Sequence, residues 1–191
     1  RLPPPPSGGA GPWWAGDPRD RPSLPTPFEE LRAESPPRGV ADTAERLLAR
    51  HGSPLVLKDP LGGSSLEVRI CDDTGQVAAA IEELLPRSRR LLVEHYVAGR
   101  ELTAGVLHDR ERREPVALPI VEIRPRRSRS FDYREKYDPE GAEELCPAPV
   151  PPELEQAARD LGVRVHRILG LSGISRTDII LDREGRLQVL E

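Results

Sequence analysis

The sequence predicts an α+β fold in which antiparallel sheets are flanked by helices. Residues 66–70 alternate apolar and polar side chains with the period of two that is typical of a strand. Residues 74–85 and 153–169 instead carry apolar side chains at helical spacing. Residues 182–185 form a tight turn between two apolar stretches, and so short a connection favours antiparallel pairing of the strands that it joins.

The remaining elements follow from the same periodicities and from turn residues. In chain order we predict a turn and short strand at 25–32, a helix at 42–51, strands at 54–58 and 66–70, a helix at 74–85, strands at 90–94, 101–107 and 115–123, a helix at 153–169, and strands at 174–181 and 186–190. Residues 124–149 are polar and are predicted to form a long loop.

The ends and buried faces of the helices can be predicted as well. Asp42 or Thr43 is expected to cap the first helix, with Glu45 completing a capping box, and Gly52 is expected to end it. The last helix is expected to bury one apolar face, made by Leu154, Ala157, Leu161, Val165 and Ile168.

Composition narrows the class of partner. A net charge of −4 and a pI near 5.7 argue against nucleic-acid binding driven by bulk charge. Cys71 and Cys146 lie far apart in the sequence and are expected to be free thiols, as in a cytoplasmic protein. The chain lacks a run of about 18 apolar residues and a secretory signal. We therefore expect a cytoplasmic protein that binds neither nucleic acid nor membrane.

Residues 1–24 differ in composition from the rest of the chain. Residues 1–37 hold half of the 22 prolines, and such a segment buries too little apolar surface to offset its ordering entropy. We predict a disordered proline-rich leader at 1–24, either a linker or a ligand for a proline-binding module, and one domain at 25–191. The missing initial Met and the end directly after a predicted strand suggest that the sequence is cut at both ends.

Lysine is rare enough here to be informative. The chain has 28 basic residues of the Lys and Arg types, of which two are lysines, Lys58 and Lys136. Lys58 ends an apolar stretch just before Gly62, Gly63, Ser64 and Ser65, whose backbone and hydroxyl groups can approach phosphate oxygens. Two isolated ammonium groups therefore suggest a bound polyphosphate. The alternatives are solvated surface lysines and an ordinary hairpin connection.

Two carboxylates in the last predicted hairpin suggest a metal site. Asp178 and Glu191 are separated by a short turn, and paired antiparallel strands can place them on the same side. Mg²⁺ usually takes one or two carboxylates together with waters and phosphates. The alternative is two unrelated surface acids.

In this order and spacing, several motifs give the chain a family resemblance. From about Pro25 to Glu191 it resembles the C-terminal, ATP-grasp region of D-alanine–D-alanine ligases. The motifs are Pro-Leu-Val-Leu-Lys at 54–58 with Gly-Ser-Ser at 63–65, Leu-Val-Glu-His-Tyr-Val-Ala-Gly-Arg-Glu at 92–101, Phe-Asp-Tyr-Arg-Glu-Lys-Tyr at 131–137, Cys-Pro-Ala at 146–148, Arg-Thr-Asp at 176–178 and Val-Leu-Glu at 189–191.

The resemblance implies an ATP-grasp fold with bound ATP and Mg²⁺, which Mn²⁺ can replace. It implies that Lys58 and Lys136 contact the phosphates and that Ser64 and Ser65 belong to a small loop that covers them. It further implies that Glu94 and the backbone near Val97 contact adenine, and that Glu101 contacts the ribose. It also implies that Tyr137 belongs to a larger covering loop, that Arg176 steadies the acyl-phosphate and tetrahedral intermediate, and that Asp178 and Glu191 hold the metal.

The implied reaction joins two D-alanines for peptidoglycan precursor synthesis. ATP phosphorylates the carboxylate of one D-alanine, and the amine of the second then displaces phosphate. Members of the family are commonly dimeric. Here Asp59 stands where proline is usual, and Glu67 places negative charge near the small loop. An inactive nucleotide-binding remnant of the same fold is therefore the alternative hypothesis.

Overall fold

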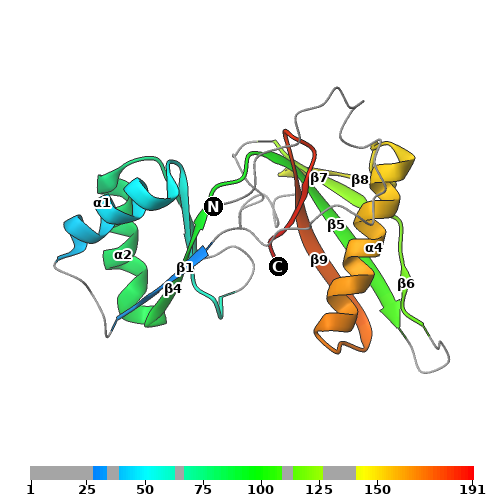
Figure 1. Ribbon diagram of the computed structural model, residues 1–191, viewed down its shortest axis with the longest axis horizontal. Coiled ribbons are helices and arrows are strands. Elements are labelled where there is room, and N and C mark those ends of the chain that lie inside the picture. The colour runs from blue at the N-terminus through cyan, green and yellow to red at the C-terminus, as the bar shows by residue number, and fades with distance from the viewer. Residues whose placement is uncertain (1–27, 34–38, 63–66, 109–113, 127–140) are drawn as a thin grey trace, which may run out of the picture.

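The computed structural model describes residues 28–33, 39–62, 67–108, 114–126 and 141–191. These residues form two α+β units, a smaller sheet covered on one face by two helices and a larger sheet covered on one face by one described helix (Figure 1). The strands of the smaller sheet lie between their own helices and the larger sheet (Figure 1). This arrangement confirms the predicted α+β class. The predicted leader at 1–24 lies outside the described residues.

The smaller sheet has four antiparallel strands. Their order is β1 (Phe28–Arg32), β4 (Arg90–His95), β2 (Leu55–Lys58) and β3 (Val68–Cys71). Helices α1 (Val40–His51) and α2 (Thr74–Ser88) supply the apolar stripes that cover one face. The shared core includes Leu47, Leu55, Leu57, Val77, Leu91 and Val93, all fully buried.

The larger sheet is also antiparallel. Its order is β10 (Leu187–Val189), β9 (Gly173–Asp182), β5 (Gly99–His108), β7 (Val121–Pro125) and β8 (Ala142–Leu145), with β6 (Val116–Ala117) pairing to β5. Helix α4 (Pro152–Ile168) packs on one face, where Leu102, Ala104 and Ile179 are fully buried. None of the helices described is long and apolar enough to cross a membrane.

Strand alternation separates a core face from a polar face in both sheets. In β5, Leu102 and Ala104 point toward α4, so Glu101 and Thr103 point to the opposite side. In β2, Leu55 and Leu57 face the helices, so Lys58 points away from them. The polar residues singled out from the sequence therefore lie on the faces that the helices leave uncovered.

The predicted cap of the first helix is wrong. Helix α1 begins at Val40 with Gly39 as its N-cap, and no side chain caps it. Thr43 is already inside the helix, where its hydroxyl donates to the Gly39 carbonyl at 2.8 Å. Asp42 lies in the first turn instead, where a negative charge favours the helix dipole. The predicted end is confirmed: Gly52 has φ of 79° and donates to the Leu48 carbonyl.

The predicted buried face of the last helix is partly wrong. Ile168, the last residue of α4, is 76% exposed, and the buried positions include Ala158 and His166. The buried residues of α4 thus do not follow the predicted apolar row along the whole helix. His166 tolerates burial because Nδ1 lies 2.7 Å from Ser175 Oγ and Nε2 lies 3.3 Å from His108 Nδ1.

The stretch from 115 to 149 is more ordered than predicted. The expected single strand at 115–123 is divided into β6 and β7, with Pro119, which has no N–H to donate, between them. The expected loop at 124–149 contains the end of β7 and all of β8, while residues 127–140 lie outside the described ones. Ala148 is 5% exposed and donates to the Ile120 carbonyl, so this part of the loop packs into the core.

Gly162 lets α4 approach the larger sheet closely. A Cβ added there would lie 2.8 Å from the Ala104 Cβ. We expect Gly162→Ala to lower the free energy of unfolding, because overpacking costs about 1–3 kcal/mol, whereas better helix propensity returns about 1 kcal/mol.

Urea unfolding measures this loss. Adding Ala104→Gly should restore part of it, since the second change removes the clashing methyl group, and Arg164→Ala on the exposed face of α4 is the matched control. Equal stability of Gly162→Ala and the unaltered chain would contradict the close approach.

Candidate nucleotide and metal site

Lys58 and Glu94 meet on the uncovered face of the smaller sheet. Strand β2 ends at Lys58, and β4 carries Glu94 opposite Val56. The Lys58 Nζ lies 3.0 Å from Glu94 Oε2, and the two side chains are 20% and 10% exposed. The structure therefore brings together two residues for which the family resemblance implies contacts with different parts of a nucleotide, the phosphates for Lys58 and adenine for Glu94.

Asp178 and Arg176 meet on the uncovered face of the larger sheet. Both lie on β9, two residues apart, and an Arg176 guanidinium nitrogen lies 2.9 Å from Asp178 Oδ2. On β5, Thr103 pairs with Asp178, and its hydroxyl donates to Asp178 Oδ1 at 2.9 Å. Thr103 did not stand out in the sequence, although the period of two in a strand at 101–107 would have placed it on the same face as Glu101.

The backbones of Asp178 and Glu191 lie side by side, and the placement of their two carboxylates on one side of the sheet stays a prediction. The Asp178 N–H donates to the Glu191 carbonyl at 2.8 Å, and the Leu190 N–H donates to the Asp178 carbonyl at 2.9 Å. The donor set fits Mg²⁺, which prefers hard oxygen ligands and retains several waters. Among the described residues there is no cluster of three or more metal-binding side chains, so the fit rests on these two carboxylates.

Val97 lies within the short connection that joins the two sheets, and Glu94 and Glu101 lie on the strands before and after it. Strand β4 ends at His95 and β5 begins at Gly99. The Tyr96 N–H donates to the Pro54 carbonyl at 3.2 Å, which fixes the start of the connection. Val97 and Glu101 are half-buried, and Glu101 shares the polar face of β5 with Thr103. The predicted adenine and ribose contacts are therefore neighbours along one segment.

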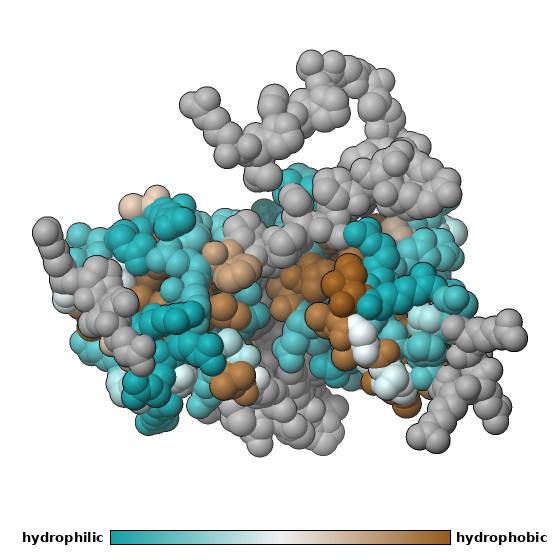
Figure 2. All heavy atoms as spheres, turned by 60° about the horizontal axis from the view of Figure 1, so that its bottom comes forward, coloured by the Kyte–Doolittle hydropathy of each residue, from teal (hydrophilic) through white to brown (hydrophobic). Residues whose placement is uncertain are grey.

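Exposed apolar side chains accompany these charged groups. Phe28 is 61% exposed on β1, where it pairs with Glu94. Ile174 is 79% exposed on β9, two residues before Arg176. Figure 2 shows hydrophobic residues gathered toward the middle of the molecule and hydrophilic residues on its outer flanks. Apolar surface beside a few charged groups is typical of small-molecule sites.

The small loop after β2 is described in part. Ser64 and Ser65 lie outside the described residues, as do Lys136 and Tyr137. Asp59, which stands where the family usually has proline, begins the loop by accepting the Leu61 N–H at 2.7 Å. This backbone hydrogen bond holds the pKa of Asp59 below its ordinary value.

Glu67 lies against this loop. A Cβ added at Gly62 would lie 3.3 Å from Glu67 Oε2, so the carboxylate faces the glycine backbone. We expect Glu67→Gln to tighten ADP binding about threefold to tenfold, since it removes a negative charge beside the loop that is predicted to cover the phosphates. Calorimetric titration with Mg–ADP measures the change, with Glu82→Gln on the exposed side of α2 as control. Unchanged affinity would mean that Glu67 does not affect the phosphates.

A charge network around one buried carboxylate, on the other face of the larger sheet, was not anticipated. Glu122 is 2% exposed and accepts two hydrogen bonds from Arg100, at 2.6 and 2.8 Å, and a third from Arg124 at 2.9 Å. The sequence had placed Arg124 in a solvated loop. The Arg100 guanidinium lowers the pKa of Glu122.

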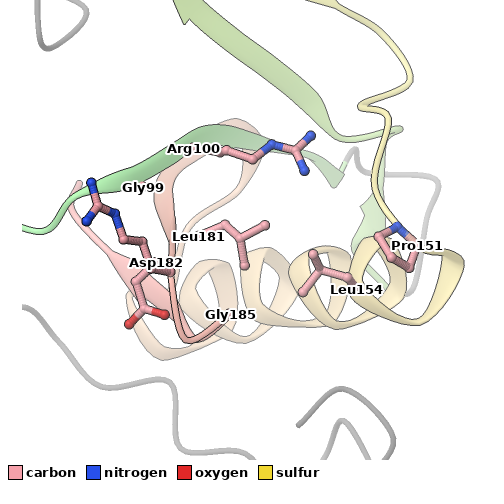
Figure 3. Close-up of a pocket in the computed structure, with 8 residues that line it drawn as sticks. Gly99, Arg100, Pro151, Leu154, Leu181, Asp182 and Gly185 are labelled. Atoms are coloured by element: carbon pink, nitrogen blue, oxygen red, sulfur yellow. The ribbon is translucent and has the colours of Figure 1, made fainter. Parts of the chain in front are cut away.

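The network borders a cavity of about 350 Å³ behind the candidate site. Its lining includes Arg100, Leu154, Leu181 and Asp182, and Figure 3 shows Arg100 and Leu181 on the strands beside α4, which carries Leu154. The cavity lies on the α4 face of the sheet, whereas Thr103 and Asp178 lie on the opposite face. It is therefore separate from the candidate nucleotide site.

The lowered pKa of Glu122 predicts a loss of stability in acid. The folded chain binds fewer protons at this carboxyl than the unfolded chain, so the stabilisation is complete above the ordinary value of about 4.3. It is lost as the pH falls through the lower folded value. We expect the melting temperature to fall more between pH 6 and pH 3 in the unaltered chain than in Glu122→Gln. Equal falls would mean that Glu122 contributes no acid sensitivity.

Comparison with known proteins shows the family to which the chain belongs. The sequence model of the D-ala D-ala ligase C-terminus matches residues 23–191. The chain is 44% identical over 138 residues to a D-alanine–D-alanine ligase of Oleidesulfovibrio alaskensis, covering 72% of this chain and 43% of the relative. It is 39% identical over 160 residues to that of Desulforudis audaxviator, covering 83% and 49%. The chain thus spans about half the length of these relatives.

Solved structures give the same result for the fold. A D-alanine–D-alanine ligase of Bacillus anthracis superimposes with a TM-score of 0.68 at 26% identity, covering 88% of this chain and 51% of that one. A structure of the Bacillus anthracis enzyme complexed with ATP gives a TM-score of 0.63 at 24% identity, covering 87% and 49%. The chain therefore belongs to the D-alanine–D-alanine ligase family of ATP-grasp enzymes and represents part of the length of its members.

Proposed function

We propose that the chain supplies the Mg–ATP site of a ligase that joins two D-alanines through an acyl-phosphate. The observation that carries this proposal is the position of Lys58, Glu94, Arg176 and Asp178. These residues lie on the uncovered faces of two adjoining sheets, within a segment matched by the ligase family from 23 to 191. The expected product is a peptidoglycan precursor, and we propose that it is made in the cytoplasm.

The nucleotide is proposed to lie along the connection between the sheets. Glu94 and the backbone near Val97 would bind adenine, and Glu101 would bind the ribose hydroxyls. Two cations and two hydroxyls would bind and cover the phosphates: Lys58, Lys136, Ser64 and Ser65. Binding of the phosphates by Lys58 would replace part of its present contact with Glu94, whose distance is 3.0 Å. Tyr137 would help to exclude water from the reacting groups.

Asp178 and Glu191 are proposed to hold Mg²⁺, for which Mn²⁺ can substitute. When bound, the metal supplies positive charge that offsets charge developing on phosphate oxygens. Thr103 and Arg176 orient Asp178 in the structure. Arg176, whose side chain is 57% exposed, would turn to the anionic intermediate and stabilise it by charge and hydrogen bonding.

A second candidate function is an inactive nucleotide-binding remnant. The observation that favours it is Glu67, whose carboxylate faces Gly62 in the phosphate loop. A negative charge there opposes phosphate binding. This candidate predicts weak Mg–ADP binding and no D-alanine-dependent turnover.

Grafting tests the two candidates against each other. This chain would replace the matching 43% of the Oleidesulfovibrio alaskensis ligase, and release of phosphate from ATP would be followed with D-alanine or L-alanine. The proposed function predicts release that requires D-alanine and disappears in an Asp178→Asn graft. A folded graft that binds Mg–ADP without D-alanine-dependent release would support the remnant.

A further inference from the structure

The Asp178 carboxylate is held unequally at its two oxygens. Oδ1 accepts the hydroxyl of Thr103 at 2.9 Å, and Thr103 is 8% exposed. Oδ2 lies 2.9 Å from Arg176, whose side chain is 57% exposed. One oxygen is thus bound inside the sheet, and the other is bound by a group that solvent reaches.

The backbone of Asp178 is fixed as well. Asp178 pairs with Thr103 on β5. Its N–H donates to the Glu191 carbonyl, and its own carbonyl accepts the Leu190 N–H, both from residues that directly follow β10. Rotation of the Asp178 side chain about its own bonds therefore remains as the main freedom of the carboxylate. The hydrogen bond from Thr103 restricts that rotation.

We propose that Thr103 is a positioning residue for the metal, which acts by fixing Asp178 Oδ1 and so aiming Oδ2 at the cation. This inference rests on the proposed metal site at Asp178 and Glu191. A carboxylate bound to a metal accepts hydrogen bonds with its other oxygen, and loss of such a partner typically lowers metal affinity about 10- to 100-fold. The Arg176 side chain would leave Oδ2 when the cation arrives, because the two positive charges repel each other.

The chain offers a matched pair of threonines for the test. Thr103→Val keeps the shape of the side chain and removes the hydroxyl, whereas Thr103→Ser keeps the hydroxyl. Thr177→Val makes the same change at a buried position next to Asp178 but on the opposite face of β9. A general effect of valine in the sheet would appear in both valine variants.

Binding of Mn²⁺ is measured by the loss of the free-ion electron paramagnetic resonance signal in the presence of saturating ADP. We expect Thr103→Val to raise the Mn²⁺ dissociation constant about tenfold, and Thr103→Ser and Thr177→Val to change it less than threefold. Affinity for ADP in the presence of EDTA should be the same in the unaltered chain and in the three variants. A general folding defect would lower this affinity.

Three results would overturn the inference. Equal Mn²⁺ affinity in Thr103→Val and Thr177→Val would mean that the hydroxyl does not position the metal ligand. Equal loss of ADP binding with and without metal would assign Thr103 a purely structural role. Failure of the unaltered chain to take up Mn²⁺ with ADP would overturn the proposed metal site itself, and this inference with it.

Discussion

Asp178→Asn is expected to weaken Mg²⁺-dependent ADP binding by about 100-fold. Loss of a residue that only orients a metal ligand lowers metal affinity about 10- to 100-fold, and loss of the ligand itself should cost at least as much. The amide removes the negative charge, and its nitrogen would face the Arg176 guanidinium, which is also a donor. The amide oxygen can still accept the Thr103 hydroxyl, so the fold should persist. Calorimetric titrations with ADP in Mg²⁺ and in EDTA measure the effect.

The EDTA titration separates a metal ligand from a structural residue. Nucleotide binding without metal should be nearly unchanged in Asp178→Asn. Asp160→Asn, on the exposed side of α4, is the control and should match the unaltered chain in both titrations. An equal loss with Mg²⁺ and with EDTA would contradict a metal role for Asp178.

Lys58→Met is expected to destabilise the chain and to weaken ADP binding, and the two effects can be separated. The change leaves the largely buried Glu94 carboxylate without its partner at 3.0 Å. Breaking a fully buried ion pair costs roughly 3–5 kcal/mol, and we expect about 2 kcal/mol here because Lys58 is 20% exposed. Urea unfolding measures this loss.

The double variant Lys58→Met with Glu94→Gln should recover most of the stability, because no unpaired charge remains in the sheet. ADP binding should stay weak, since the cation proposed to bind phosphate is still missing. A double variant as unstable as Lys58→Met would mean that the ion pair contributes little to folding. Unchanged ADP affinity in Lys58→Met would remove Lys58 from the phosphate site.

The sequence predicted the fold well where local patterns decide the structure. Alternation and helical spacing located the strands and helices, and the short turn at 182–185 was enough to place Asp178 beside the end of the chain. The helix termini were less predictable. Gly39 begins α1 without a side-chain cap, and Thr43, a residue favoured at caps, lies inside the helix.

Contacts between distant strands could not be predicted from these patterns. The hydrogen bond between Thr103 and Asp178 joins residues 75 positions apart and depends on the register of β5 with β9. The ion pair of Lys58 with Glu94 depends in the same way on the register of β2 with β4. Burial of His166 depends on Ser175 and His108, two polar partners that no periodicity identifies.

Both sheets are proposed to contribute to one Mg–ADP site. Hydrogen–deuterium exchange of the chain with and without Mg–ADP tests it most directly, because long exchange times report on strand amides. We expect added protection both in peptides covering 55–58 and 92–101 and in peptides covering 173–182, and we expect Asp178→Asn to lose this added protection. Protection confined to one sheet, or none in a folded chain, would contradict a shared site.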